Sequence, residues 1–146
     1  MAVADCAGLP LAVHTTSASP HEVSLGADTL LESFAVGFPG GLIGDNAYDS
    51  DPPDVELAAA GIEVIAPRRG GRKKPATQEG RSLRRCHRRY RVERLFAWLQ
   101  NFRRPVVWYE YHQENFLGFV HLGCILIRLV LFMRRLLACS RGKGER

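Results

Sequence analysis

The segment of residues 81–104 is rich in arginine and contains a single acidic residue, Glu93. On a helix, positions three, four and seven residues apart return to the same side, so Arg89 and Gln100 share a face with Glu93. Cys86 and Ala97 lie on the same face, and an apolar stripe beside it predicts packing on a core. The stripe consists of Val92, Leu95, Phe96, Leu99 and Phe102. A carboxylate held at the edge of a core among cations is expected where a metal ion is bound next to a phosphate backbone.

A second interpretation of Glu93 requires no chemistry. A glutamate among arginines is most often part of a solvated helix face, and here Arg89 and Glu93 have the spacing of an i,i+4 ion pair. The local pattern by itself favours this interpretation. The choice between a metal-binding carboxylate and a solvated ion pair therefore depends on the remaining sequence.

Charge is distributed very unevenly along the 146 residues. Residues 1–67 contain ten acids and no lysine or arginine, whereas residues 68–146 contain all 20 basic residues and five acids. The two parts therefore carry net charges of −10 and +15, and twelve of the basic residues lie between Arg68 and Arg94. Such asymmetry predicts a polyanion partner for the second part of the chain. The acidic part would repel this partner unless its carboxylates are internal or hold cations.

The cysteines and histidines predict neither a disulfide framework nor a zinc site, because the four cysteines are widely spaced and form no C-x-x-C pair. The apolar run of residues 116–133 raises the question of a membrane, but His121 and Arg128 interrupt it. A membrane span needs about 20 predominantly apolar residues. We therefore expect a buried core helix and no membrane partner, with a helix on a membrane surface as the weaker alternative.

Pattern and turn residues predict a mixed α/β layer fold. The expected strands are residues 1–4, 9–16, 42–44 and 62–66. Ser19 and Glu22 form a capping box for a helix that ends near residue 34, and Asp51 caps a helix over 52–60. The helix that contains Glu93 follows a basic Gly/Pro-rich loop over 67–80, breaks at Pro105 and leads to a hydrophobic C-terminal helix. One domain is expected over residues 1–138, followed by a polar tail over 139–146.

Asp45 is the second candidate for chemistry, because it follows the apolar strand 42–44 at the end where α/β folds tend to build their sites. Taken alone, Asp45 is also a suitable turn residue in the tripeptide Gly-Asp-Asn.

Asp45 and Glu93 together carry a resemblance that covers nearly the whole chain. LIGDNAYDSD (42–51) and RRYRVERLFAWLQNFRR (88–104) resemble bacterial insertion-sequence transposases of the DDE class, in the subgroup with the signature Tyr-x2-Arg-x3-Glu-x6-Lys. Residues 18–22 and 114–127 are also similar to that group. The resemblance implies DNA cleavage and strand transfer by a ribonuclease-H-like fold, a mixed sheet with flanking helices. Its three catalytic carboxylates hold two divalent metal ions, Mg²⁺ or Mn²⁺.

Residue by residue, the resemblance implies that Asp45 is the second catalytic carboxylate and Glu93 the third. Arg89 matches the arginine of the signature, whereas Cys86 stands where tyrosine is expected and Gln100 where lysine is expected. The first aspartate belongs to the first strand of the family's fold, before the hairpin of residues 1–13. Asp5 matches a different, non-catalytic position. The fold is thus expected to lack its first strand here, and this chain alone is expected to be catalytically inactive.

The implied partner is double-stranded DNA, at the ends of the insertion sequence and at its target, in the bacterial cytoplasm and nucleoid. Further partners are the N-terminal portion of the transposase and other transposase subunits. The expected DNA contacts are Arg68, Arg69, Arg72, Lys73, Lys74, Arg84, Arg85, Arg88, Arg89, Arg91 and Gln100.

The favoured interpretation is a transposase or the downstream part of one, and several alternatives to it stay open at this point. One is a catalytically incomplete DNA-binding fragment that regulates transposition or is a relic. Another is a basic protein with a membrane-associated C-terminal helix. A third is an unfolded relic, because a sheet that lacks a strand exposes an edge that invites aggregation.

Overall fold

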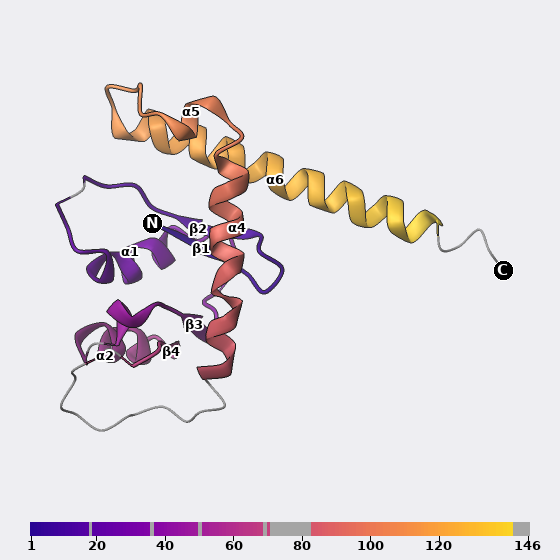
Figure 1. Ribbon diagram of the computed structural model, residues 1–146. Coiled ribbons are helices and arrows are strands. Elements are labelled where there is room, and N and C mark those ends of the chain that lie inside the picture. Colours follow the sequence, from indigo (N-terminus) through magenta and orange to yellow (C-terminus); the bar gives the residue numbers. More distant parts are fainter. Residues whose placement is uncertain (18, 36, 50, 69, 71–82, 142–146) are drawn as a thin grey trace.

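The computed structural model describes residues 1–17, 19–35, 37–49, 51–68, 70 and 83–141. These residues form a mixed α/β arrangement, as expected (Figure 1). The elements in chain order are β1 (Ala2–Ala4), β2 (Pro10–Val13), the 3₁₀ helix η1 (Glu22–Leu25), α1 (Gly26–Leu31), β3 (Gly41–Ile43), η2 (Asn46–Tyr48), α2 (Asp51–Ala59), β4 (Glu63–Ile65), η3 (Arg84–Arg89), α4 (Tyr90–Leu99), α5 (Arg103–Val106) and α6 (Gln113–Arg141).

The four strands form two separate pairs, each close to where the sequence predicts strands. β1 and β2 are antiparallel, with Val3 opposite Ala12, whereas β3 and β4 are parallel, with Leu42 opposite Val64. Figure 1 shows η3 and α4 running past both pairs. Within the described residues, no strand joins the two pairs into one sheet.

Asp5 has a structural role at the turn between β1 and β2. Its carboxylate accepts hydrogen bonds from the backbone N–H groups of Ala7 at 2.7 Å and Leu9 at 2.8 Å. Gly8 adopts a φ of 83°, which favours glycine. These bonds organise the hairpin turn.

Two hydrophobic clusters stabilise the molecule. One joins the hairpin, α1, α2 and the β3–β4 pair, and it includes Val3, Leu30, Leu42, Leu57 and Val64. The other joins β2, α4 and α6, and it consists of Val13, Leu95, Leu99, Val120, Cys124 and Ile127. The hairpin contributes to both clusters and so connects the acidic part of the chain to the basic part.

The expected capping box at Ser19 is wrong. The helix begins at Glu22 as the 3₁₀ helix η1, with His21 at its N-cap and no side-chain cap. It ends at Leu31 rather than near residue 34, because Ser33 bridges to Ala12 and the N–H of Phe34 donates to the carbonyl of Leu11 at 2.7 Å. Pairing with β2 replaces the last helical turn.

The helix that contains Glu93 is shorter than expected and does not continue to Arg104. Residues Arg84–Arg89 form a 3₁₀ helix, and α4 ends at Leu99, where the Asn101 side chain donates to the carbonyls of Ala97 and Trp98. Pro105 lies within the short helix α5 instead of at a break. Proline is tolerated there because the backbone N–H groups in the first turn of a helix have no acceptor within the helix, so no hydrogen bond is lost.

The first half of α6 is a core helix, as predicted. Val120, Cys124 and Ile127 recur at helical spacing and pack on α4, while a Cβ at Gly123 would lie only 3.0 Å from the Leu99 side chain. A guanidinium nitrogen of Arg128 donates to the carbonyl of Pro10 at 3.0 Å.

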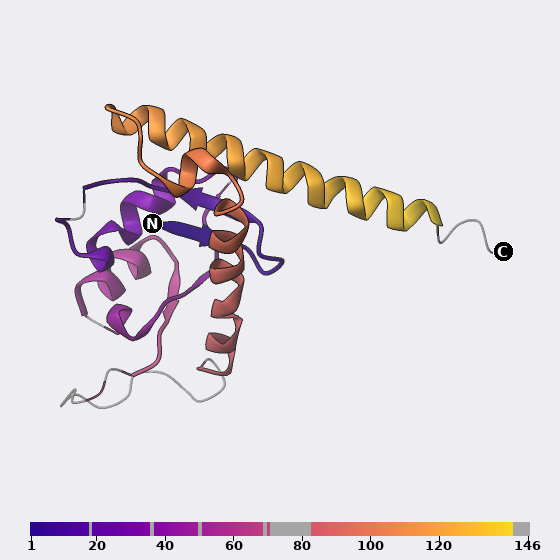
Figure 2. The same ribbon diagram turned by 45° about the horizontal axis from the view of Figure 1, so that its top comes forward.

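The prediction of a buried helix is wrong for the second half of α6, which projects from the rest of the molecule (Figures 1 and 2). Most apolar side chains of this half are exposed, namely Leu129, Val130, Phe132, Met133, Leu136 and Leu137, whereas Leu131 is partly buried against the cluster of β2, α4 and α6. Within α6, Gln113–Ala138 is long and apolar enough to cross a membrane, and 22% of its most apolar part is buried. One such helix is weak evidence for a membrane.

Candidate functional site

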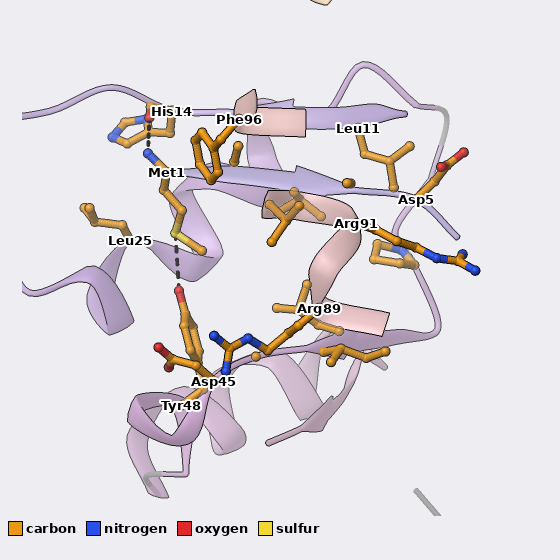
Figure 3. A pocket seen from close by; sticks show the side chains of 18 of the residues that line it. Met1, Asp5, Leu11, His14, Leu25, Asp45, Tyr48, Arg89, Arg91 and Phe96 are labelled. Carbon is orange, nitrogen blue, oxygen red and sulfur yellow. Dashed lines mark hydrogen bonds between the residues drawn. The ribbon is translucent and has the colours of Figure 1, made fainter. Parts of the chain in front are cut away.

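A cavity of about 990 Å³ lies between the two strand pairs. Its walls include β1, β3, the start of the η2 turn and one side of η3 and α4. Figure 3 shows this space with the hairpin on one side and Asp45 and Tyr48 on the other. The cavity therefore collects residues from both the acidic and the basic part of the chain.

Asp45 lies at the C-terminal end of β3, as predicted, and lines this cavity. One oxygen of its carboxylate accepts a hydrogen bond from the N–H of Ala47 at 2.9 Å, and its carbonyl accepts one from the N–H of Tyr48 at 3.1 Å. Asp45 is thus a turn residue in this structure. The other carboxylate oxygen takes no part in these two hydrogen bonds, which leaves Asp45 suitable for binding a ligand.

Tyr48 holds the Asp45 turn in place, and the sequence pattern did not single it out. It is buried, and its hydroxyl donates to the sulfur of Met1 at 3.3 Å across the cavity. Its ring lies so close to Gly44 that a Cβ there would meet it at 2.8 Å. Gly44 could be recognised in the sequence as a turn residue before Asp45. That Tyr48 packs against Gly44 becomes evident only in the structure.

Four arginines of η3 and α4 line the same cavity: Arg85, Arg88, Arg89 and Arg91. Figure 3 shows the Arg89 side chain reaching toward Asp45 and Tyr48, while Arg91 extends toward the end of the cavity near Asp5. The side-chain Nε of Arg91 is buried without a hydrogen-bond partner in the structure. This concentration of guanidinium groups favours the binding of an anion.

Glu93 does not lie with Asp45. It is not among the residues that line the cavity, its side chain is 67% exposed, and one of its oxygens lies 3.9 Å from a guanidinium nitrogen of Arg89. The expectation that this carboxylate is held at the edge of the core is wrong for this structure. The i,i+4 ion pair on a solvated helix face is the arrangement observed.

The other predicted residues are spread over the surface. Cys86 is partly buried in η3, Gln100 is exposed at the end of α4, and Arg84 is exposed but does not line the cavity. Phe96, expected in the apolar stripe, is 44% exposed and lines the cavity instead. Arg68 is exposed just after β4, and the predictions for Arg69, Arg72, Lys73 and Lys74 concern positions outside the described residues.

The described residues do not fit a metal site. No group of three or more histidine, cysteine, aspartate or glutamate side chains comes together among them. Mg²⁺ prefers several oxygen ligands. Here the Arg89 side chain reaches toward Asp45, whereas Glu93 pairs with Arg89 and does not line the cavity. Two carboxylates so arranged supply too little negative charge, so no reaction step is assigned to a metal ion in this chain.

Arg94 was not predicted as important, yet it fastens α4 to the hairpin. One of its nitrogens donates to the carbonyl of Ala7 at 2.6 Å, and its guanidinium lies 5.0 Å from the ring centroid of Trp98. A Cβ at Gly8 would meet Arg94 at 2.5 Å. This arginine therefore has a structural role, unlike the cavity arginines.

Comparison with known proteins agrees with the resemblance. A family model described as "Transposase DDE domain" matches residues 1–127. The "Putative transposase for insertion sequence element IS402" of Burkholderia cepacia is 33% identical over 134 residues, which is 86% of this chain and 59% of that protein. The chain thus spans less than two thirds of this relative. No solved structure matches.

Proposed function

The chain belongs to the DDE transposase family, and we propose that it forms part of the catalytic domain of an insertion-sequence transposase that cleaves and joins DNA. The observation that carries this proposal is the cavity that Asp45, at the end of β3, shares with arginines of η3 and α4, of which Arg89 reaches toward Asp45. A carboxylate beside a cluster of cations suits chemistry on a phosphodiester.

The fold proposed for the complete domain is ribonuclease-H-like. An antiparallel hairpin followed by a parallel strand pair and flanking helices supports this proposal. The domain is proposed to extend over residues 1–138, with residues 139–146 as a tail.

In the complete enzyme, Asp45 and Glu93 are proposed as two of three carboxylates that hold divalent metal ions, Mg²⁺ or Mn²⁺. Bound there, divalent ions would supply Lewis-acid chemistry to a phosphodiester. For this role Glu93 has to separate from Arg89, and an exposed ion pair of this kind contributes little to stability. The third carboxylate would come from a part of the transposase that this chain does not contain.

The proposed partner is double-stranded DNA in the bacterial cytoplasm and nucleoid, with no membrane. Arg85, Arg88 and Arg89 are exposed, line one wall and can contact phosphates without displacing the fold. Such contacts position DNA but do not read its sequence. Arg89 has a second role, because it neutralises Glu93 when DNA is absent.

DNA binding by this chain tests the first part of the proposal. Arg85→Ala and Arg88→Ala are each expected to weaken binding to duplex DNA and to reduce the slope of log K against log salt by about one. Arg103→Ala is the matched control, because this exposed arginine lies in α5 outside the cavity. Equal loss in all three variants, measured by fluorescence anisotropy, would contradict the assignment of the cavity as the DNA site.

Catalysis is tested in a transposase of the relative's full length that contains this sequence. Asp45→Asn and Glu93→Gln are expected to abolish Mg²⁺-dependent nicking of insertion-sequence ends, while DNA binding persists. Glu110→Gln is the control, since Glu110 pairs with Arg104 far from Asp45 in the sequence and does not line the cavity. Full nicking activity in both variants would contradict the assignment of Asp45 and Glu93 to the catalytic centre. DNA binding without nicking in any form would leave a regulatory or relic DNA-binding fragment.

A further inference from the structure

The loop between α5 and α6 carries the two most exposed aromatic side chains of the described residues. This aromatic loop comprises residues 107–112, with the sequence Val-Trp-Tyr-Glu-Tyr-His, and it lies at the opposite end of α6 from the projecting half (Figure 1). Tyr109 is 70% exposed, Tyr111 is 94% exposed, and Trp108 is half-exposed. Exposed aromatic side chains that gather in one place mark a binding surface, since each ring offers a large apolar face.

Contacts of Trp108 fix the position of the aromatic loop. The Trp108 ring stacks on the ring of Phe116 in α6, with centroids 4.4 Å apart and an angle of 12° between the ring planes. The indole N–H of Trp108 donates to the carbonyl of Glu110 at 2.6 Å, which closes the loop on itself. The loop therefore presents its two tyrosines from a defined position, so little conformational freedom is lost when a ligand binds to them.

The aromatic loop adjoins the cavity that contains Asp45. Trp108 and Phe116 line this cavity, as do Thr15 and the four arginines of η3 and α4. The side chain of Gln113, the first residue of α6, donates to the carbonyl of Thr15 and so ties the end of the loop to the segment after β2. DNA whose phosphates are bound by the cavity arginines would therefore lie beside the aromatic loop.

The charges of the aromatic loop are compatible with nucleic acid. Glu110 is the single acid of residues 107–112, and its carboxylate pairs with a guanidinium nitrogen of Arg104 at 2.6 Å. A neutralised carboxylate repels a phosphate backbone little. A second copy of this chain is the other candidate occupant, because tyrosine and tryptophan are also common in protein interfaces. The position of the loop beside the cavity arginines favours nucleic acid over a second copy.

We propose that Tyr109 and Tyr111 stack on the exposed face of a nucleobase in the DNA whose phosphates the cavity arginines bind. Every base has such a face, so this contact selects exposed bases and not a particular sequence. Inside an intact duplex the neighbouring pairs cover both faces of each base. The ligand is therefore an unpaired base or the terminal base pair of a DNA end. This inference rests on the proposed function and narrows its substrate to DNA with an exposed base.

The test compares the affinity of this chain for a single strand of about 15 nucleotides, a blunt duplex of the same sequence and a closed circular duplex without ends. Tyr109→Ala and Tyr111→Ala are each expected to weaken binding of the single strand by at least about fivefold, because a base loses its stacking partner. Binding of the closed circle is expected to stay unchanged. A loss with the single strand alone identifies an unpaired base as the ligand, and a loss with the blunt duplex as well identifies the terminal base pair.

Matched variants separate stacking from other roles of the two tyrosines. Tyr109→Phe and Tyr111→Phe keep the ring and should keep the affinity of the parent chain. Phe132→Ala is the control, because Phe132 is an exposed aromatic residue of α6 that does not line the cavity. The slope of log K against log salt should stay unchanged in the tyrosine variants, in contrast to Arg85→Ala, since no phosphate contact is removed. In the parent chain, irradiation of a single strand that contains iodouracil should crosslink Tyr109 or Tyr111, as identified by mass spectrometry of the peptides.

Unchanged affinity of both alanine variants for the single strand and the blunt duplex would overturn the inference, as would an equal loss with the closed circle. A changed oligomeric state in sedimentation, with unchanged DNA affinity, would assign the aromatic loop to an interface between copies of this chain instead. Failure of the parent chain to bind any of the three DNA forms would refute the proposed function together with the inference. DNA binding that does not depend on the tyrosines would refute the inference alone.

Discussion

The β1–β2 hairpin and the β3–β4 pair are of similar size but are held differently. The hairpin is fastened to distant parts of the chain by Ser33, Arg94 and Arg128, each of which contacts its backbone. The β3–β4 pair packs on α2 through Leu57 and Val64 and presents its other edge to the cavity. Asp45 thus belongs to the pair that is held by packing on α2. The molecule joins its acidic and basic parts at the hairpin, and its candidate site lies beside the β3–β4 pair.

The largest expected effect concerns the attachment of α4 to the hairpin. Leu95 is fully buried in the cluster of β2, α4 and α6, so Leu95→Ala should lower the free energy of unfolding by about 2–5 kcal/mol, measured by urea denaturation. Phe96→Ala, at a half-exposed neighbour in the same helix, should cost much less. Equal costs would show that α4 is not anchored through Leu95.

The next effect concerns the support of Asp45 in the β3–β4 pair. Gly44→Ala places a Cβ 2.8 Å from the Tyr48 ring and should destabilise the protein by about 1–3 kcal/mol, because the buried tyrosine has to move. Gly40→Ala is the matched control, since nothing lies within 4 Å of a Cβ there. Thermal unfolding of the two variants distinguishes them, and identical midpoints would contradict the close packing.

A comparable or smaller effect is expected at the hairpin turn. Arg94→Ala removes the bond to Ala7 and the contact with Trp98, which should cost about 1–2 kcal/mol. Arg84→Ala is the control, because this arginine is exposed. If Arg94→Ala left the urea midpoint unchanged while DNA binding was lost, Arg94 would belong with the cavity arginines instead.

The smallest expected effect is a dependence on alkaline pH. Burial raises the pKa of the Cys124 thiol to about 11, and nearby Arg128 opposes this rise. The unfolded thiol ionises near its ordinary pKa of 9.0, so stability is retained below pH 9 and falls as the pH rises toward 11. When the pH is raised from 8 to 10, the free energy of unfolding should fall by about 1 kcal/mol less in Cys124→Ala than in the parent chain. Parallel losses in urea titrations would contradict this role for Cys124.

Local sequence patterns predicted the elements whose causes are local. The four strands, the position of Asp45 after β3, and the end of α2 before Gly61, with its φ of 75°, follow from apolar runs and turn residues. Membership in the transposase family was also predictable, because two strings around Asp45 and Glu93 carry it.

Long-range contacts account for the errors. The helix before Phe34 ends early because its backbone pairs with β2, and the buried residues of α6 are those that pack with β2 and α4. The helical pattern around Glu93 fitted two environments and by itself favoured the solvated ion pair, which is the one observed, whereas the 3₁₀ geometry of η3 could not be seen in it.

The sequence by itself therefore determined the family, the separation of charge and the candidate carboxylates, since these depend on residue identity and spacing. Only the tertiary structure decided that Asp45 lies with the arginines while Glu93 lies outside, that Arg94 and Tyr48 support the site, and that β1 and β3 line one cavity. The physical reason is that packing and backbone pairing join residues up to 118 positions apart, as between Arg128 and Pro10, and no local pattern encodes such contacts.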